Sequence, residues 1–308
     1  MTMPLHPMLQ DMLDKGAGLP PLQSFTPAEI RATDLARYAR VPRAPVAHVE
    51  DRVIPGPRGD IRIRIYRPDL DLAHPVITFF HGSGFVICSI DTHDGLCRQL
   101  CLRAGAVVVS VDYALAPENK FPAGPDDCLA AALWVSDNLG TLGGDGAAHI
   151  LAGDSAGGTM GIVTAMRMRD AGAARIAAQL LMYPVTNYPD PPPPSYAERG
   201  EGWGLTAAAM HYFWDHYLNK PAQGADPLAS PLRAINLTGL PATYIMTAVY
   251  DPLYEEGEQF AARLVEAGVD TKLVRYADMN HGFMSWVGIL DRADEALDAA
   301  CAWLETRT

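Results

Sequence analysis

The chain has 308 residues, 49% of them hydrophobic, and a formal net charge of −12. This length and hydrophobic content can provide the core of one large α/β domain or of two small ones. The acidic balance argues against nucleic acid and anionic membranes as partners, because both attract clustered lysines and arginines.

The first 45 residues predict two short helices separated by Leu19-Pro20-Pro21. Thr26 is the expected N-cap of the second helix, with Pro27 in its first turn. No signal peptide is expected, because basic residues are missing from the start and Asp11 and Asp14 interrupt any apolar stretch. No apolar run approaches the length of a transmembrane helix.

The five cysteines form neither a metal-binding pattern nor a disulfide framework; they are Cys88, Cys97, Cys101, Cys128 and Cys301. We interpret them as small buried hydrophobic residues, which fits a reducing cytoplasm. No histidine, cysteine or acidic cluster has the spacing of a metal site, and no Gly-rich nucleotide loop follows a strand. We therefore expect no metal and no cofactor.

Strands are predicted at 46–54 and 61–66, and the second alternates Ile with Arg as an exposed antiparallel strand would. From Pro75 onward, apolar strands alternate with helices as far as a closing helix at 291–305. This alternation predicts a mostly parallel sheet covered by helices on both faces. Asp91 and His93 lie near the start of one helix, and we expect them to cap it.

The segment 184–226 interrupts this alternation. Its proline run at 188–195 predicts a rigid loop that cannot be helical. A helix follows at 206–218, with bulky side chains at helical spacing. Two interpretations are open for these side chains, ordinary core packing or one wall of an acyl pocket; they are Met210, Phe213, Trp214 and Tyr217.

The residues at 153–157, Gly-Asp-Ser-Ala-Gly, fit the G-x-S-x-G pattern between a predicted strand and a predicted helix. At such a turn the serine takes a strained backbone conformation that lifts its hydroxyl clear of the sheet. The flanking glycines are needed because side chains there would collide with neighbouring backbone. Ser155 is therefore a candidate nucleophile.

A serine nucleophile needs a base and an acid that orients the base, and in hydrolases with this turn the chain order is Ser, Asp or Glu, His. Asp251 follows the predicted strand at 243–250, and His281 lies in a loop after the strand at 271–276. Both follow strands in a predicted parallel sheet, so all three side chains should meet at its carboxyl edge.

A Gly-rich loop, His81-Gly82-Ser83-Gly84-Phe85, follows the apolar strand at 75–80. Such a loop can turn several backbone N–H groups toward the negative oxygen of a tetrahedral intermediate. We expect His81 to order this loop rather than to take part in catalysis.

These motifs, together with Tyr113-Ala114-Leu115-Ala116-Pro117-Glu118, resemble those of the bacterial hormone-sensitive-lipase family of carboxylesterases, over nearly the whole chain. The resemblance implies the α/β-hydrolase fold, with Ser155 as nucleophile, His281 as general base and Asp251 as its orienting acid. It also implies oxyanion donors from the backbone N–H groups of Ser83, Gly84 and Ala156.

The family usually has glycine where this chain has Ser83. The serine could narrow the site or offer a further hydroxyl donor, so substrate shape is affected and the reaction class is not. Under this resemblance the catalytic domain spans 46–185 and 223–308, and a helical cap spans 1–45 and 186–222. We expect the substrate pocket to involve Phe85, Met210, Phe213, Trp214 and Phe283.

The sequence thus predicts a serine carboxylesterase that cleaves short- to medium-chain acyl esters of small molecules. An amidase or peptidase, a lactone hydrolase, or a non-catalytic receptor of the same fold are the alternatives. The sequence leaves a monomer and a homodimer both open.

Overall fold

The computed structural model describes residues 3–307, and of 145–147 the backbone alone. One sheet of eight strands runs through the described chain in the order β1-β2-β4-β3-β5-β6-β7-β8. The pairs β1–β2 and β2–β4 are antiparallel, and all other pairs are parallel. The strands are β1 (His48–Gly56), β2 (Gly59–Arg67), β3 (His74–Phe80), β4 (Val107–Asp112), β5 (Gly144–Asp154), β6 (Ala178–Met182), β7 (Ala242–Tyr250) and β8 (Thr271–Asn280).

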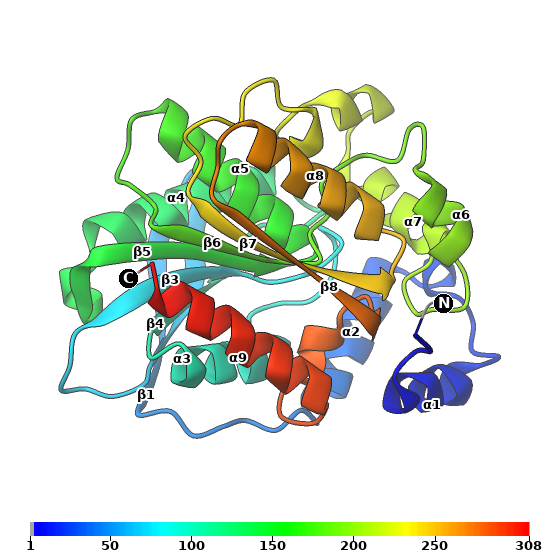
Figure 1. Ribbon diagram of the computed structural model, residues 1–308, viewed down its shortest axis with the longest axis horizontal. Coiled ribbons are helices and arrows are strands. Elements are labelled where there is room, and N and C mark those ends of the chain that lie inside the picture. Colours follow the sequence, from blue (N-terminus) through cyan, green and yellow to red (C-terminus); the bar gives the residue numbers. More distant parts are fainter. Residues whose placement is uncertain (1–2, 308) are drawn as a thin grey trace.

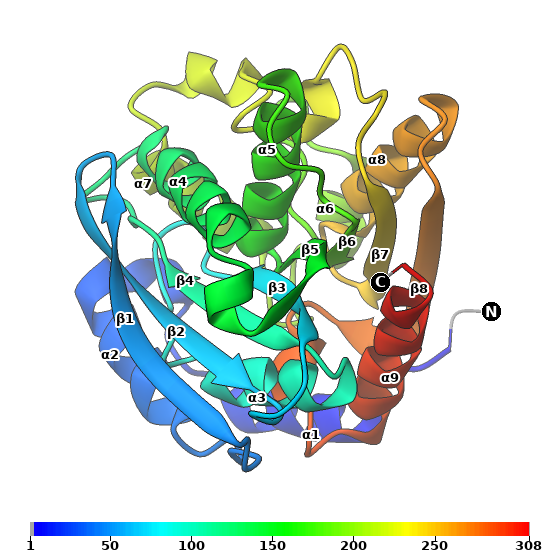
Figure 2. The ribbon, with the colours of Figure 1, turned by 90° about the vertical axis from the view of Figure 1, so that its left-hand side faces the viewer.

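Helices cover both faces of this sheet, as the alternating pattern predicts. Figures 1 and 2 show α4 (Ala123–Asp137), α5 (Ala156–Asp170) and α8 (Tyr254–Glu266) on one face. The opposite face carries α3 (Asp94–Arg103) and α9 (Asp291–Glu305). The predicted α/β-hydrolase fold class is confirmed, because a mostly parallel sheet lies between two helical layers.

Neighbouring residues of one strand contribute to different cores, because successive side chains of a strand point to opposite faces. In β4, Val109 and Val111 belong to the core beneath α4 and α5, whereas Val108 belongs to the core beneath α3 and α9. Both cores are built from buried apolar side chains, so the strand ends are held in place from two sides.

Four further helices gather near the carboxyl end of the sheet, and Figure 1 shows three of them, α1, α6 and α7, beyond the arrowheads of β7 and β8. They are α1 (Pro7–Gly16), α2 (Pro27–Tyr38), α6 (Pro194–Arg199) and α7 (Ala207–Tyr217). Thr26 caps α2 with the predicted geometry, since its side chain accepts from the Glu29 N–H while Glu29 accepts from the Thr26 N–H. None of the described helices has the length and apolar character that crossing a lipid bilayer requires.

Two local predictions are wrong. Strand β2 is not exposed, because it lies between β1 and β4, with Ile63 buried and Arg64 bound to acidic side chains. The proline run does not exclude helix throughout, because α6 begins at Pro194. A proline fits the first turn of a helix, where its missing N–H would have had no partner.

Candidate active site

Ser155 lies at the sharp turn between β5 and α5. Its backbone φ of +53° is in the left-handed region, which a non-glycine residue rarely adopts. The turn is tight because a Cβ on Gly157 would lie 1.9 Å from the Phe80 carbonyl oxygen, and one on Gly153 would lie 2.3 Å from the Gly157 oxygen. Only glycine fits at these two positions, so the local sequence fixes the turn.

His281 connects Ser155 with Asp251. Its Nε2 is 2.9 Å from the Ser155 Oγ, and its Nδ1 is 2.7 Å from Asp251 Oδ2. Asp251 follows β7 and is fully buried, and its Oδ1 accepts the Leu253 N–H at 2.9 Å. Because the Asp251 carboxylate can only accept, Nδ1 carries the proton and Nε2 is free to accept the one from serine.

Tyr183 supports the histidine from the side. It is buried with φ +40°, and its ring lies edge-on to the His281 ring, with 4.9 Å between centroids. The same tyrosine contacts Phe283. The sequence analysis missed Tyr183, because only its position at the end of β6 marks it.

The loop after β3 approaches Ser155 with free N–H groups. Within residues 3–307, no hydrogen bond uses the backbone N–H of Ser83, Gly84 or Ala156. Ala156 is the first residue of α5, where an N–H has no partner inside the helix. These groups can therefore donate to an oxygen that gains negative charge near Ser155.

The Ser83 side chain is occupied within its own loop. The Tyr113 hydroxyl donates to the His81 carbonyl at 2.7 Å, so the Ser83 hydroxyl must donate to the Tyr113 oxygen at 2.8 Å. The Ser83 Oγ in turn accepts the Phe85 N–H at 2.9 Å. The Ser83 hydroxyl therefore has no proton left for a substrate, and it holds the loop instead.

His81 is fully buried and stacks on Tyr113 at 4.5 Å between ring centroids. Burial and the neighbouring His93 lower the pKa of His81 to about 3, so its ring is neutral. His93 occupies the N-cap position of α3, as predicted, but the prediction that the side chains of Asp91 and His93 cap this helix is wrong. No side-chain bond from His93 caps α3; the ring faces Asp154, and Asp91 pairs with Arg62 and Arg64.

The predicted pocket residues lie in two places. The Phe213 ring is so close to the oxyanion loop that a Cβ on Gly84 would lie 2.5 Å from it. Phe85 and Trp214 are buried and contact each other, with 5.1 Å between their ring centroids. Met210 is buried in the same core, whereas Phe283 lies in the other core, against Tyr183.

Comparison with known proteins agrees with this geometry. A family model described as alpha/beta hydrolase fold matches residues 77–285. The esterase LipI of Mycobacterium tuberculosis is 42% identical over 272 residues, which cover 84% of this chain and 83% of LipI. The chain belongs to the hormone-sensitive-lipase family of carboxylesterases.

Two further relatives illustrate the breadth of this family. A solved structure of a hyperthermophilic esterase from the archaeon Pyrobaculum calidifontis superposes with a TM-score of 0.91 at 40% identity, covering 99% of both chains. An ethyl acetate hydrolase of Pseudomonas putida is 35% identical over 76% of this chain and 75% of its own.

Proposed function

We propose that the chain is a serine carboxylesterase in which Ser155, His281 and Asp251 hydrolyse short- to medium-chain acyl esters. The observation that carries this proposal is the position of the His281 ring, 2.9 Å from the Ser155 hydroxyl and 2.7 Å from a buried carboxylate. A serine hydroxyl becomes nucleophilic when such a base is ready to take its proton.

In the proposed cycle, the Ser155 Oγ attacks the ester carbonyl while its proton passes to His281 Nε2. The carbonyl oxygen becomes negative and accepts from the free N–H groups of Ser83, Gly84 and Ala156. His281 then gives its proton to the departing alcohol, which leaves an acyl group on Ser155. Water then attacks the acyl group with His281 as base, and His281 returns that proton to the Ser155 Oγ as the acid leaves, so these groups and water account for every bond made and broken.

The segments 1–45 and 186–222 form the cap of the proposed enzyme, over a catalytic domain of 46–185 and 223–308. Phe213 lies against the oxyanion loop, so it can limit the space beside the reacting carbonyl. Each buried methylene contributes about 0.8 kcal/mol until the pocket is full. We therefore expect the best substrates between about butyrate and octanoate.

A panel of p-nitrophenyl esters of increasing acyl length tests the substrate class, and a fluorophosphonate probe tests the nucleophile. We expect the probe to modify Ser155, as mass spectrometry of peptides would show. Ser155→Ala should lower kcat by about 10⁶-fold and leave the melting temperature near that of the wild type. An adduct on another residue, or a Ser155→Ala variant with normal turnover, would contradict the mechanism.

A further inference from the structure

A buried carboxylate lies beside the nucleophile but outside the proposed triad. Asp154, the last residue of β5, is 4% exposed, and its Oδ1 accepts the Gly82 N–H at 2.7 Å. The contact is close, because a Cβ on Gly82 would lie 2.3 Å from Asp154 Oδ2. Asp154 therefore holds the start of the oxyanion loop directly.

The Asp154 carboxylate is paired with a buried histidine. His93 Nε2 lies 3.3 Å from Asp154 Oδ1, and both side chains are about 95% buried. The Thr92 hydroxyl donates to the Ser89 carbonyl at 2.8 Å, so it can only accept from His93 Nδ1 at 2.9 Å. Both ring nitrogens of His93 thus face oxygen atoms that can accept a hydrogen bond.

The charge of Asp154 follows from these contacts. Burial alone would raise the pKa of the Asp154 carboxyl, but the His93 charge and the hydrogen bonds from His93 and Gly82 hold that pKa below its usual range. The result is an Asp154 carboxylate that is paired with His93 and almost fully buried beside the oxyanion loop.

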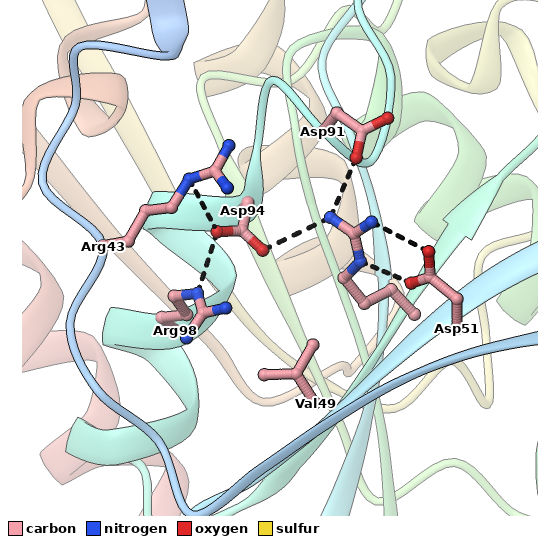
Figure 3. A pocket seen from close by; sticks show the side chains of 7 residues that line it. Arg43, Val49, Asp51, Asp91, Asp94 and Arg98 are labelled. Carbon is pink, nitrogen blue, oxygen red and sulfur yellow. Dashed lines mark hydrogen bonds and ion pairs between the residues drawn. The ribbon is translucent and has the colours of Figure 1, made fainter.

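The segment that carries His93 is itself held by charges. The next residue, Asp94, borders a cavity of about 300 Å³ that Figure 3 shows. The carboxylate of Asp94 accepts from the Tyr66 hydroxyl at 3.0 Å and from Arg98 at 2.8 Å, and Arg43 lies 3.2 Å away. The backbone next to His93 is therefore anchored by this second cluster.

The oxyanion loop needs such a support because its backbone is strained. Gly84 has φ +51° and the non-glycine residue Phe85 has φ +68°, so two successive residues lie in the left-handed region. Such conformations persist only where the surroundings hold them in place. The two free N–H groups of the loop belong to Ser83 and Gly84, the two residues that follow Gly82.

We propose that Asp154 and His93 are positioning residues that hold Gly82 and thereby aim the Ser83 and Gly84 N–H groups at the ester carbonyl. This role rests on the proposed esterase function. Its effect belongs to the transition state, because the loop's N–H groups bind most strongly when the carbonyl oxygen becomes negative.

Four variants test the pair: Asp154→Asn, Asp154→Ala, His93→Gln and the control His149→Gln. His149 is also on β5 and buried, between the hydroxyls of Thr78 and Ser136, and it does not contact the loop. The readouts are kcat and KM with p-nitrophenyl butyrate, and the Ki of an alkyl boronic acid. The boronic acid forms a tetrahedral adduct with the serine and mimics the intermediate.

We expect Asp154→Ala and His93→Gln to lower kcat by about 10- to 100-fold, less than deletion of an oxyanion donor. KM should change by less than about twofold, and the boronic acid Ki should rise by the same factor by which kcat falls. The loss of kcat should be smaller in Asp154→Asn than in Asp154→Ala, since the asparagine amide oxygen can still accept the Gly82 N–H. His149→Gln should keep the wild-type kcat and Ki.

Unchanged kcat and Ki in folded His93→Gln and Asp154→Asn would overturn the positioning role but not the proposed esterase function. Losses of kcat no larger than that of His149→Gln would have the same meaning. A wild-type protein without ester turnover would overturn the proposed function together with this inference. Melting curves of all four variants establish which are folded, and His93→Gln alone is sufficient if the Asp154 variants do not fold.

Discussion

The two sides of the candidate site are built in different ways. On the sheet side, Ser155, Asp251 and His281 come from the ends of β5, β7 and β8 and are joined by short hydrogen bonds. On the side of the proposed cap, α7 contributes buried aromatic side chains, and Arg31 of α2 donates to two carbonyl groups. We infer that the sheet side sets the chemistry and the cap side selects the ester.

The two cap segments also differ from each other. Helix α7 places Phe213 and Trp214 in the core, against Gly84 and Phe85. Helix α2 is anchored by Arg31, which donates to the Val86 and Ala116 carbonyls and pairs with Glu118. Burial of aromatic surface stabilises far more than a partly exposed ion pair does, so we expect α7 to be the more firmly held of the two proposed cap helices.

The largest effect that separates the two sides is expected on the sheet side. Asp251→Asn should lower kcat by about 10⁴-fold, because the amide no longer fixes the His281 tautomer that accepts the serine proton. Acyl-length preference should stay the same, since the cap is untouched. Steady-state kinetics with three ester lengths checks both statements. Asp278→Asn, another buried acid, which pairs with Arg292, is the control and should keep near-normal kcat.

On the cap side, Phe213→Leu should move the substrate preference. The smaller side chain leaves room beside Gly84, so the ratio of kcat/KM for octanoate over butyrate should rise about 4- to 15-fold, as one or two further buried methylenes would give. Phe260→Leu is a matched control, because Phe260 is fully buried in α8 and far in sequence from both cap segments. An unchanged ratio in Phe213→Leu would show that Phe213 is core and not pocket wall.

Glu256 joins the two sides and gives a pH effect on stability. It is buried in α8, and its Oε1 accepts the N–H groups of Thr186 and Asn187, where the second cap segment begins. Burial raises the pKa of Glu256 to about 8. The folded protein therefore keeps this proton between about pH 4.5 and 8 while the unfolded chain loses it, so stability falls as pH rises through that range.

Glu256→Gln removes this titration and keeps an oxygen for the two N–H groups. We expect the melting temperature of Glu256→Gln, relative to the wild type, to rise by several degrees between pH 5 and pH 8.5, since about 1 kcal/mol corresponds to 2–4 °C in proteins of moderate size. Calorimetry at four pH values measures the difference. A difference that is constant with pH would show that Glu256 is ionised throughout.

The smallest effect is expected at Arg31. Its side chain is 29% exposed and that of Glu118 58% exposed, so the pair should contribute about 1 kcal/mol or less. Arg31→Ala should raise KM by about twofold, leave kcat unchanged and increase trypsin cleavage within α2. Arg31→Lys keeps the positive charge but loses the planar guanidinium group. Its KM and its rate of trypsin cleavage should lie between those of the wild type and of Arg31→Ala. A large loss of kcat in Arg31→Ala would show that α2 contributes to the catalytic step. The contrast between the two sides of the site would then be wrong.

The order of Ser155, Asp251 and His281 along the chain was sufficient to predict their meeting. Each follows an apolar strand, and parallel strands bring their carboxyl ends to one edge, so the geometry follows from the pattern. The turn at Ser155 was equally predictable, because its glycines are those that the close approach of Phe80 and Gly157 requires. The fold class followed from the same alternation of strands and helices.

Contacts between distant segments depended on the tertiary structure. The sequence places His93 at a helix start, and a cap was the natural local expectation; its true partner, Asp154, is 61 residues away. Two other hydrogen-bonded pairs are also far apart in the sequence. Ser83 and Tyr113 are separated by 30 residues, and Glu256 and Thr186 by 70. Periodicity and turn chemistry describe neighbours along the chain, whereas the partner of a buried polar group is whichever group the packed strands and helices bring within hydrogen-bonding distance of it.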